Sequence, residues 1–167
     1  MRLIDPLLME FDREASTTRK LIERCPDAKL GWQPHRKSMT LGKLAHHLAS
    51  IPVFVGTSVL KDGLDFATAP PAPPVPATTA GIVKAFDTAC AGAKEAMARL
   101  DDATALGTWT LSQGPVTLMA MPRIAFLRTI LLYHSVHHRG QLSVYLRLLD
   151  VPVPSVYGPT ADESPFG

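Results

Sequence analysis

Apolar side chains recur every three or four residues in four long stretches of the sequence, which is the pattern of amphipathic helices. Each stretch begins at a capping residue or at a proline that suits the first turn of a helix. The expected starts are Asp5-Pro6, Ser38 or Thr40, Thr78 or Thr79, and Met121-Pro122. No segment alternates convincingly between apolar and polar residues, and residues 108–111 are at most a short extended piece. The pattern therefore predicts an all-α protein, a four-helix bundle.

The connection between the second and third helices is long and rich in proline, because residues 70–76 read Pro-Pro-Ala-Pro-Pro-Val-Pro. A helix of roughly 20 residues is about 30 Å long. The extended stretch from Lys61 to Ala77 is long enough to return over that length, so we expect a crossover that makes helices two and three parallel. Residues 151–167 lack helical periodicity. We expect them to form an extended C-terminal tail on a single domain that spans residues 1–167.

Composition narrows the class of protein. The chain has 167 residues, 46% of them hydrophobic, and a formal net charge of +2. These values are typical of a folded domain and do not indicate disorder or a nucleic-acid-binding surface. Two cysteines are too few for a disulfide scaffold, and no apolar run approaches the length of a membrane span. We expect a cytoplasmic protein without nucleic-acid or membrane partners.

The last helix carries two histidines, His134 and His138, on its core-facing side. With Leu127 taken as zero and about 100° per residue, they lie at about −20° and about +20°. In the second helix, His47 lies at the edge of the apolar stripe, whereas His46 faces outward. Two interpretations remain open. The buried imidazoles are hydrogen-bonded to neighbouring groups, or they share a metal ion for which His47 supplies a third ligand.

Three histidines from two helices leave a coordination position open, as in catalytic zinc sites, where water completes a set of three protein ligands. The all-imidazole set also suits nickel, iron or copper. Ser135 stands where a metalloprotease of the H-E-x-x-H type has its glutamate, so the motif is not that of such a protease. His35, in a loop, is expected to be a solvated bystander like His46, and His137 lies on the flank of the last helix.

These residues resemble the DinB-like (damage-inducible) superfamily of metal-binding four-helix bundles over nearly the whole chain. The motifs that carry the resemblance are Gly31-Trp32-Gln33-Pro34-His35, residues 38–48, residues 64–66, residues 121–125, His134-Ser135-Val136-His137-His138-Arg139-Gly140-Gln141, and residues 153–159. The resemblance implies an up-down-down-up bundle with a crossover. It also implies a divalent metal, commonly nickel or zinc, on His47, His134 and His138, and often a homodimer. Some relatives act as transferases or isomerases that use small thiols such as mycothiol or bacillithiol.

Two functional hypotheses follow. In the first, the protein is a metal-dependent hydrolase or thiol-dependent transferase or isomerase acting on a small molecule. In the second, it is a non-catalytic metal-binding or ligand-binding bundle of a stress response. Gln141 is aimed to orient a ligand, whereas Arg139, at about 120°, is expected off the core stripe. Asp12 and Glu14 on the first helix are the nearest candidates for acid–base work, and no spacing selects either.

Overall fold

The computed structural model describes residues 1–166 and is mostly helical. The long helices are α1 (Ile4–Glu23), α2 (Leu41–Ser58), α3 (Thr79–Ala98) and α6 (His134–Leu148). The short ones are the 3₁₀ helix η1 (Asp27–Lys29), α4 (Asp102–Leu106), α5 (Arg123–Phe126) and the π-helix η2 (Leu127–Tyr133). Among residues 1–166, no helix combines the length and apolar character that crossing a membrane requires.

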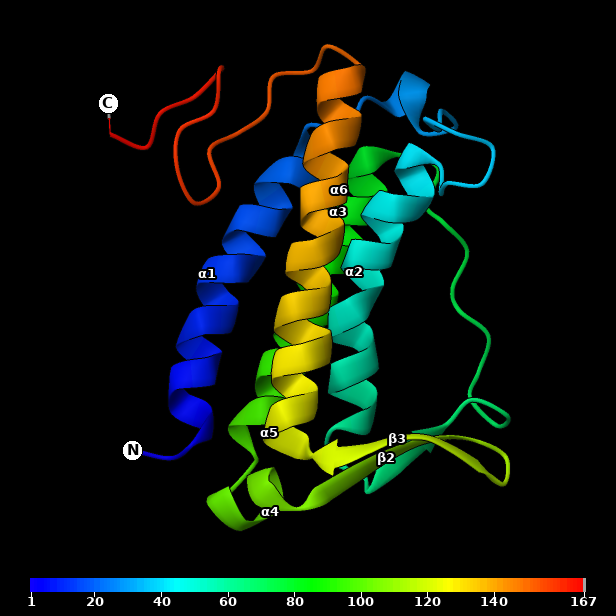
Figure 1. Ribbon diagram of the computed structural model, residues 1–167, viewed down its shortest axis with the longest axis vertical. Helices are drawn as coiled ribbons and strands as arrows, with labels where there is room; N and C mark the ends of the chain where they lie inside the picture. The colour runs from blue at the N-terminus through cyan, green and yellow to red at the C-terminus, as the bar shows by residue number, and fades with distance from the viewer. Residues whose placement is uncertain (167) are drawn as a thin grey trace.

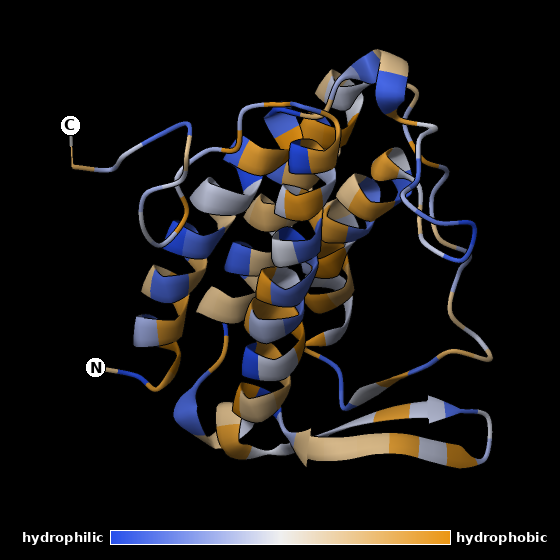
Figure 2. Cartoon of the chain, turned by 45° about the horizontal axis from the view of Figure 1, so that its top comes forward, coloured by the Kyte–Doolittle hydropathy of each residue, from blue (hydrophilic) through white to orange (hydrophobic). Residues whose placement is uncertain are grey.

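The long helices lie side by side, and α1 and α2 each contact both α3 and α6 (Figure 1). Residues 66–78 return along the outside of the molecule from the end of α2 to the opposite end, where α3 begins (Figure 1). Apolar positions alternate with polar ones along the helices, as the colours in Figure 2 show. The apolar positions form one core, which includes large side chains such as Trp109 and Phe126.

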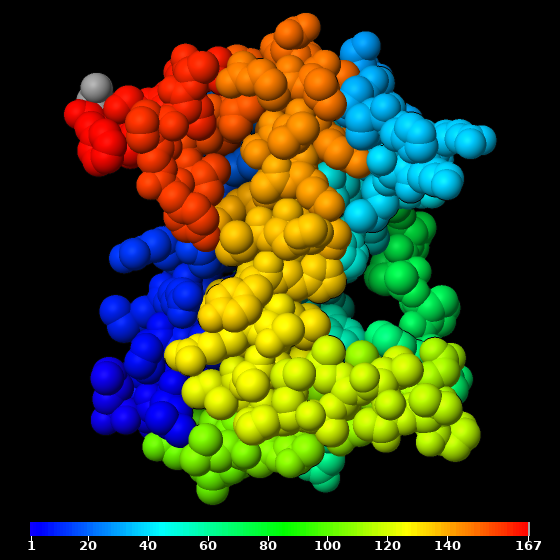
Figure 3. All heavy atoms as spheres, viewed as in Figure 1, coloured from blue at the N-terminus to red at the C-terminus, as the bar shows by residue number. Residues whose placement is uncertain are grey.

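The prediction of a mainly helical fold is confirmed, but the all-α prediction missed a small three-stranded sheet. Its strands are β1 (Gly63–Asp65), β2 (Thr108–Gln113) and β3 (Val116–Pro122), in the order β1-β2-β3. Strand β1 is parallel to β2, and β2 pairs antiparallel with β3. The β2–β3 hairpin covers the end of the molecule where α6 and its preceding turns begin (Figure 3).

The hairpin has a two-residue loop, Gly114-Pro115, because Gln113 pairs with Val116. Gly114 has a φ of +57°, which glycine adopts without the steric cost of a Cβ atom. Met121-Pro122 therefore ends a strand, contrary to our expectation that it begins the last helix, and helix α5 starts one residue later at Arg123. Pairing with the preceding strand of the hairpin outweighs the preference of proline for a first helical turn.

The other three long helices were predicted to begin at capping residues, and two of them do. Thr40 caps α2 by accepting a hydrogen bond from the backbone N–H of Lys43, and Thr78 caps α3 in the same way through Gly81. The expectation for α1 is wrong, since that helix begins at Ile4 and Asp5 lies inside its first turn. The carboxylate of Asp5 instead accepts hydrogen bonds from Arg2, which lowers the pKa of Asp5.

A buried arginine attaches the sheet to the helices. Arg123, at the start of α5, is only 5% exposed. Its guanidinium donates hydrogen bonds to the backbone carbonyls of Val59, Lys61, Thr104 and Thr108, and it pairs with Asp62. These partners belong to the end of α2, the approach to β1, helix α4 and strand β2, so one side chain holds the sheet at this end of the molecule.

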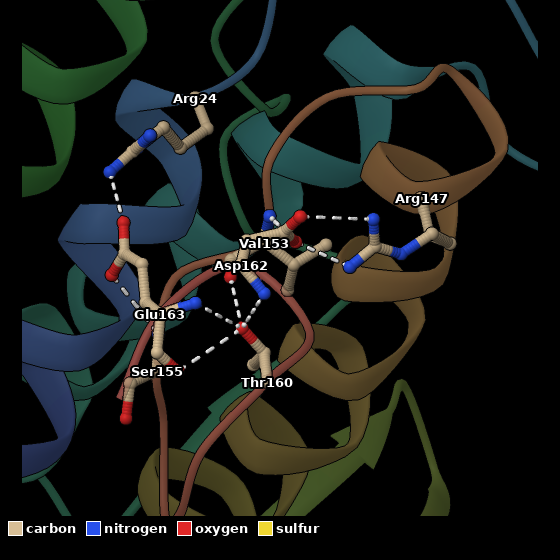
Figure 4. A network of polar contacts seen from close by, with 7 residues as sticks. All are labelled: Arg24, Arg147, Val153, Ser155, Thr160, Asp162 and Glu163. Carbon is tan, nitrogen blue, oxygen red and sulfur yellow. Dashed lines mark hydrogen bonds and ion pairs between the residues drawn. The ribbon is translucent and has the colours of Figure 1, made fainter. Parts of the chain in front are cut away.

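The C-terminal segment forms no helix or strand over residues 151–166, as expected, and Gly167 lies outside the described residues. Polar contacts hold it in place (Figure 4). Glu163 pairs with Arg24 just after α1, and Asp162 pairs with Arg147 of α6. The Thr160 hydroxyl accepts hydrogen bonds from the backbone N–H groups of Asp162 and Glu163. The segment is therefore folded back onto the ends of two long helices.

Candidate metal centre

Three histidine side chains converge between α2 and α6. Nε2 of His134 lies 3.2 Å from Nε2 of His47 and 2.7 Å from Nε2 of His138. One ring nitrogen from each of the three histidines lies within 4.8 Å of the others. His138 is buried, and His47 and His134 are half-buried. The structure therefore brings together the three residues that the sequence singled out.

Local helix geometry explains this convergence. His134 and His138 are one helical turn apart on α6, and their ring centroids are 4.5 Å apart. His47 reaches them from α2, with its ring centroid 4.4 Å from that of His138. His46 is not part of the group, in agreement with the helical-wheel argument that chose between the two neighbours.

A hydrogen bond fixes the orientation of one ring. Nδ1 of His138 lies 2.7 Å from Oε1 of Gln141, three residues further along α6. Because an amide oxygen only accepts, Nδ1 carries the proton and the Nε2 lone pair is free to bind a cation. This contact places Gln141 where it orients the His138 ring.

Burial favours the neutral form of all three imidazoles. Desolvation and the neighbouring His138 and His134 rings lower the pKa of His47 to about 4. The pKa values of His134 and His138 are also lowered, in both cases chiefly by desolvation. Neutral imidazole is the form that binds metal ions, so the site needs no deprotonation near neutral pH.

The spacing of the nitrogens suits a metal ion. An ion about 2.0–2.1 Å from each nitrogen in tetrahedral geometry separates the nitrogens by about 3.4 Å. The His47–His134 separation of 3.2 Å is close to this value, and the 2.7 Å separation of His134 and His138 needs a small opening. Three imidazole nitrogens that converge in this way also form a suitable donor set, so the residues fit a divalent cation.

Comparisons with known proteins identify the family of this chain. The sequence model of a family described as the DinB superfamily matches residues 10–142. The chain belongs to the DinB superfamily.

Individual relatives extend the match over almost the whole chain. An uncharacterized protein of Bacillus subtilis strain 168, YrdA, is 27% identical to this DinB-superfamily chain over 164 residues, which cover 96% of this chain and 91% of YrdA. A DinB-like protein from Bacillus cereus, known from its crystal structure, shares 26% sequence identity with this chain. The two structures match with a TM-score of 0.70 over 90% of this chain and 95% of that chain. The DinB-like protein YjoA of Bacillus subtilis has a TM-score of 0.68 at 15% identity, over 87% and 93% of the two chains, and supports the fold alone.

The remaining histidines lie outside the cluster. His35 is exposed in the loop before α2, and its Nδ1 accepts a hydrogen bond from the backbone N–H of Lys37. His137 is exposed on α6, edge-on to His138 with 4.9 Å between ring centroids. His46 is half-buried, and desolvation lowers its pKa. These three residues provide natural controls for substitutions within the cluster.

The expectation that Arg139 lies off the core is wrong, because its side chain is only 2% exposed. It pairs with Glu14 of α1 at 2.6 Å and donates a hydrogen bond to the Tyr157 hydroxyl. The error comes from the width of the buried face of α6, because this helix packs against both α1 and α2, and Arg139 faces α1 while His138 faces α2.

A cavity of about 350 Å³ adjoins the histidines. Its lining residues come from α2, residue 66, the β2–β3 hairpin, α5, η2 and the start of α6. They are His47, Ser50, Ile51, Phe54, Phe66, Leu111, Met119, Phe126, Ile130 and His134. The part of the lining that β2 and β3 supply was not predicted from the sequence, because the hairpin was not predicted. A signal was present, since Gly114-Pro115 separates two segments rich in β-branched, aromatic and other apolar residues.

The acid–base candidates of α1 lie elsewhere. Asp12 pairs with Lys94 on the surface, and Glu14 is engaged by Arg139 and Tyr157. None of the ten described residues that line the cavity is an aspartate, a glutamate, a lysine or an arginine. The ionisable side chains at this site are therefore the histidines themselves.

Proposed function

We propose that this protein is a metal-dependent enzyme of the DinB superfamily, in which His47, His134 and His138 hold one divalent ion. Nickel and zinc are the ions we favour, because both accept imidazole ligands. The observation that carries the proposal is the convergence of three neutral ring nitrogens beside a cavity that two of the rings line. When bound, such an ion lowers the pKa of a water molecule or thiol that contacts it, which produces a nucleophile near neutral pH.

The scaffold we infer for this site is an up-down-down-up four-helix bundle, in which the proline-rich segment 66–78 is the crossover between α2 and α3. In this arrangement α2 and α6 are neighbours in the bundle, and each supplies its ligands from the middle or the beginning of a rigid helix. The contacts of α2 with α3 and α6 support this arrangement. Rigid helices suit a metal site because small displacements of the ligands weaken binding.

The residues around the cluster have separable tasks. Gln141 keeps the Nδ1 proton on His138, so that Nε2 faces the centre of the cluster. The apolar cavity wall excludes water from one side of the site, which strengthens electrostatic interactions within it. The chain's own thiols have no part, since burial raises the pKa values of Cys25 and Cys90 to about 12. Any thiol reactant is therefore a separate small molecule.

The reaction classes we favour are hydrolysis and the transfer or isomerisation of a small molecule that depends on a low-molecular-weight thiol. We further propose that the protein acts as a homodimer. Both points rest on the family to which the chain belongs. The small size of the cavity supports a small-molecule substrate.

One observation favours a second candidate, a non-catalytic bundle that binds a metal or a small ligand in a stress response. No carboxylate lines the cavity in the described part of the chain, so a general base other than histidine is missing. In this alternative the histidines bind the ion or ligand without turnover. The two candidates therefore share the metal site and differ only in the reaction.

The test begins with elemental analysis of natively purified protein. We expect one nickel or zinc ion per chain, and its loss in His47→Ala, His134→Ala and His138→Ala. The matched controls are His46→Ala and His137→Ala, which remove a neighbouring imidazole on the same helix and should retain the ion. Circular dichroism of each variant establishes that the fold persists.

Turnover is then measured with ester and amide substrates and with thiol–electrophile pairs, before and after chelation. Activity that chelation removes and the metal restores supports the enzyme. Full activity in metal-free protein would contradict it. Stoichiometric metal without turnover of any of these substrates favours the non-catalytic alternative.

A further inference from the structure

The cavity beside the histidines has two chemically different ends. His47, Ser50 and His134 supply its polar atoms, and the Ser50 hydroxyl already donates a hydrogen bond to the backbone carbonyl of His47. The other seven lining residues are aromatic or aliphatic. A molecule that fills the cavity therefore meets histidine rings at one end and apolar side chains over the rest of its surface.

The sheet builds part of the hydrocarbon end. Leu111 of β2 and Met119 of β3 are cross-strand partners, and both line the cavity. Leu118, which directly precedes Met119 in β3, is absent from the lining and is 52% exposed, as expected where successive side chains of a strand point to opposite faces. The hairpin thus presents one face to the cavity and the other to solvent.

Aromatic rings form another part of this end. The Phe54 ring lies 5.7 Å from that of Phe126 and 6.3 Å from that of Phe66. Phe66 is 47% exposed although it borders the cavity, which places an apolar ring between the cavity and solvent. Rings at these separations interact favourably with a further aromatic ring.

The lining argues against highly polar ligands. Phosphates and carboxylates are usually held by arginine, lysine or several backbone N–H groups, and no charged side chain other than histidine lines this cavity among the described residues. Sugar hydroxyls would lose hydrogen bonds to water at the apolar end without gaining others. The polar body of a thiol cofactor therefore does not suit this end of the cavity.

The volume limits the size of the ligand. A dry apolar cavity of about 150 Å³ in another protein binds benzene. A cavity of about 350 Å³ therefore accommodates a substituted six-membered ring or a branched alkyl group of similar size. We propose that the cavity binds the apolar, ring-sized body of a small organic substrate, with its sulfur or oxygen head against His47 and His134.

The position of the head rests on the proposed function, because it presumes an ion on the three histidines. The position of the apolar body does not. Three probes separate the two parts. Toluene has the body without a head, 2-mercaptoethanol has a thiol head without the body, and phenylmethanethiol has both.

Trp109 provides a readout that does not depend on activity. Its ring stacks on Phe126 with centroids 3.9 Å apart, and Phe126 lines the cavity. In a Trp32→Phe background, Trp109 is the one remaining tryptophan. We expect toluene to change its fluorescence in metal-free protein. By calorimetry on zinc-loaded protein, phenylmethanethiol should bind at least about tenfold more tightly than 2-mercaptoethanol.

Adjacent residues of β3 supply a matched pair of variants. Met119→Glu places a carboxylate in the cavity and should weaken toluene and phenylmethanethiol binding by about tenfold or more, while 2-mercaptoethanol is unaffected. Leu118→Glu makes the same change on the solvent face and should leave all three probes unchanged. Met119→Leu keeps the side chain apolar and should retain binding, which controls for damage to the hairpin.

The outcomes distinguish this inference from the proposed function. Equal binding of the two thiols, no toluene response, or equal effects of Met119→Glu and Leu118→Glu would overturn the inference even if the histidines bind zinc. Toluene binding that Met119→Glu removes would support the apolar body. If phenylmethanethiol then binds no better with zinc than without it, the proposed position of the head is overturned, whereas the metal function is judged separately by metal content and by turnover.

Discussion

Two neighbouring residues of α6, His138 and Arg139, are both buried and polar, yet they belong to clusters with opposite properties. Arg139 points toward α1, where Glu14 and the Tyr157 hydroxyl satisfy its guanidinium. His138 points toward α2, where its Nε2 meets the ring nitrogens of the other histidines. Adjacent residues of one helix thus belong to an ion-pair cluster and to a cluster of histidine ring nitrogens.

The two clusters differ in whether the protein itself supplies partners for their polar groups. In the arginine cluster, opposite charges and hydrogen bonds are complete within the protein, and the guanidinium also stacks 4.9 Å above the Tyr157 ring. In the histidine cluster, ring nitrogens meet one another and no negative group is among them, and a cavity lies alongside. Burial of a polar side chain therefore indicates stability in the first cluster and ligand binding in the second.

The largest expected effect separates the clusters by stability. Replacing Arg139 with methionine leaves Glu14 nearly buried without its partner, which typically costs about 3–5 kcal/mol in the free energy of unfolding. Urea denaturation measures the loss. Arg128→Met, at an exposed position of η2, is the control and should change stability by less than about 0.5 kcal/mol. An unchanged unfolding midpoint in Arg139→Met would contradict the structural role of this cluster.

The next effect concerns affinity alone. Gln141→Leu removes the acceptor for the Nδ1 proton of His138, so its ring loses its fixed tautomer. We expect metal affinity to fall by about 10–100-fold, the range typical of residues that orient a metal ligand. Titration with a competing chelator measures it. Gln141→Glu keeps the acceptor and should preserve affinity. If both variants bind equally well, Gln141 has no orienting role.

A smaller effect is expected where the tail meets the arginine cluster. Tyr157→Phe removes the hydroxyl that donates to Glu14 at 2.7 Å and accepts from Arg139, while the ring remains over the guanidinium. The loss should be about 0.5–1.5 kcal/mol of unfolding free energy. Metal affinity should not change, because the hydroxyl does not contact the histidines. A loss of metal binding in this variant would show that the clusters are coupled.

The smallest effect at any one pH concerns protonation of the histidines. The pKa of His47 is about 4 in the folded protein, below the ordinary value of 6.5. The unfolded chain therefore binds more protons, and metal-free protein should lose stability as the pH falls from about 6.5 toward about 4. Solvent reduces the size of this change, since His47 is only half-buried. Denaturation across this pH range measures it, and His47→Ala should flatten the dependence.

Much of the candidate site followed from helical periodicity. Spacing on one helix paired His134 with His138, and the edge of the apolar stripe on α2 selected His47 over His46, as the structure confirms for their positions. Three expectations failed because they depend on contacts between separate elements. The sheet depends on pairing between Gly63–Asp65 and a hairpin more than forty residues away. The start of the last helix gave way to strand pairing, and the burial of Arg139 depends on the packing of α6 against α1.

The sequence by itself determined the four amphipathic helices and the inward-facing histidines, because residues three and four apart share a helix face whatever surrounds the helix. Only the tertiary structure decided that α2 and α6 are neighbours, that Arg139 meets Glu14, and that β2 and β3 close the apolar end of the cavity. Those features depend on contacts between residues far apart in the chain. Local periodicity does not encode them.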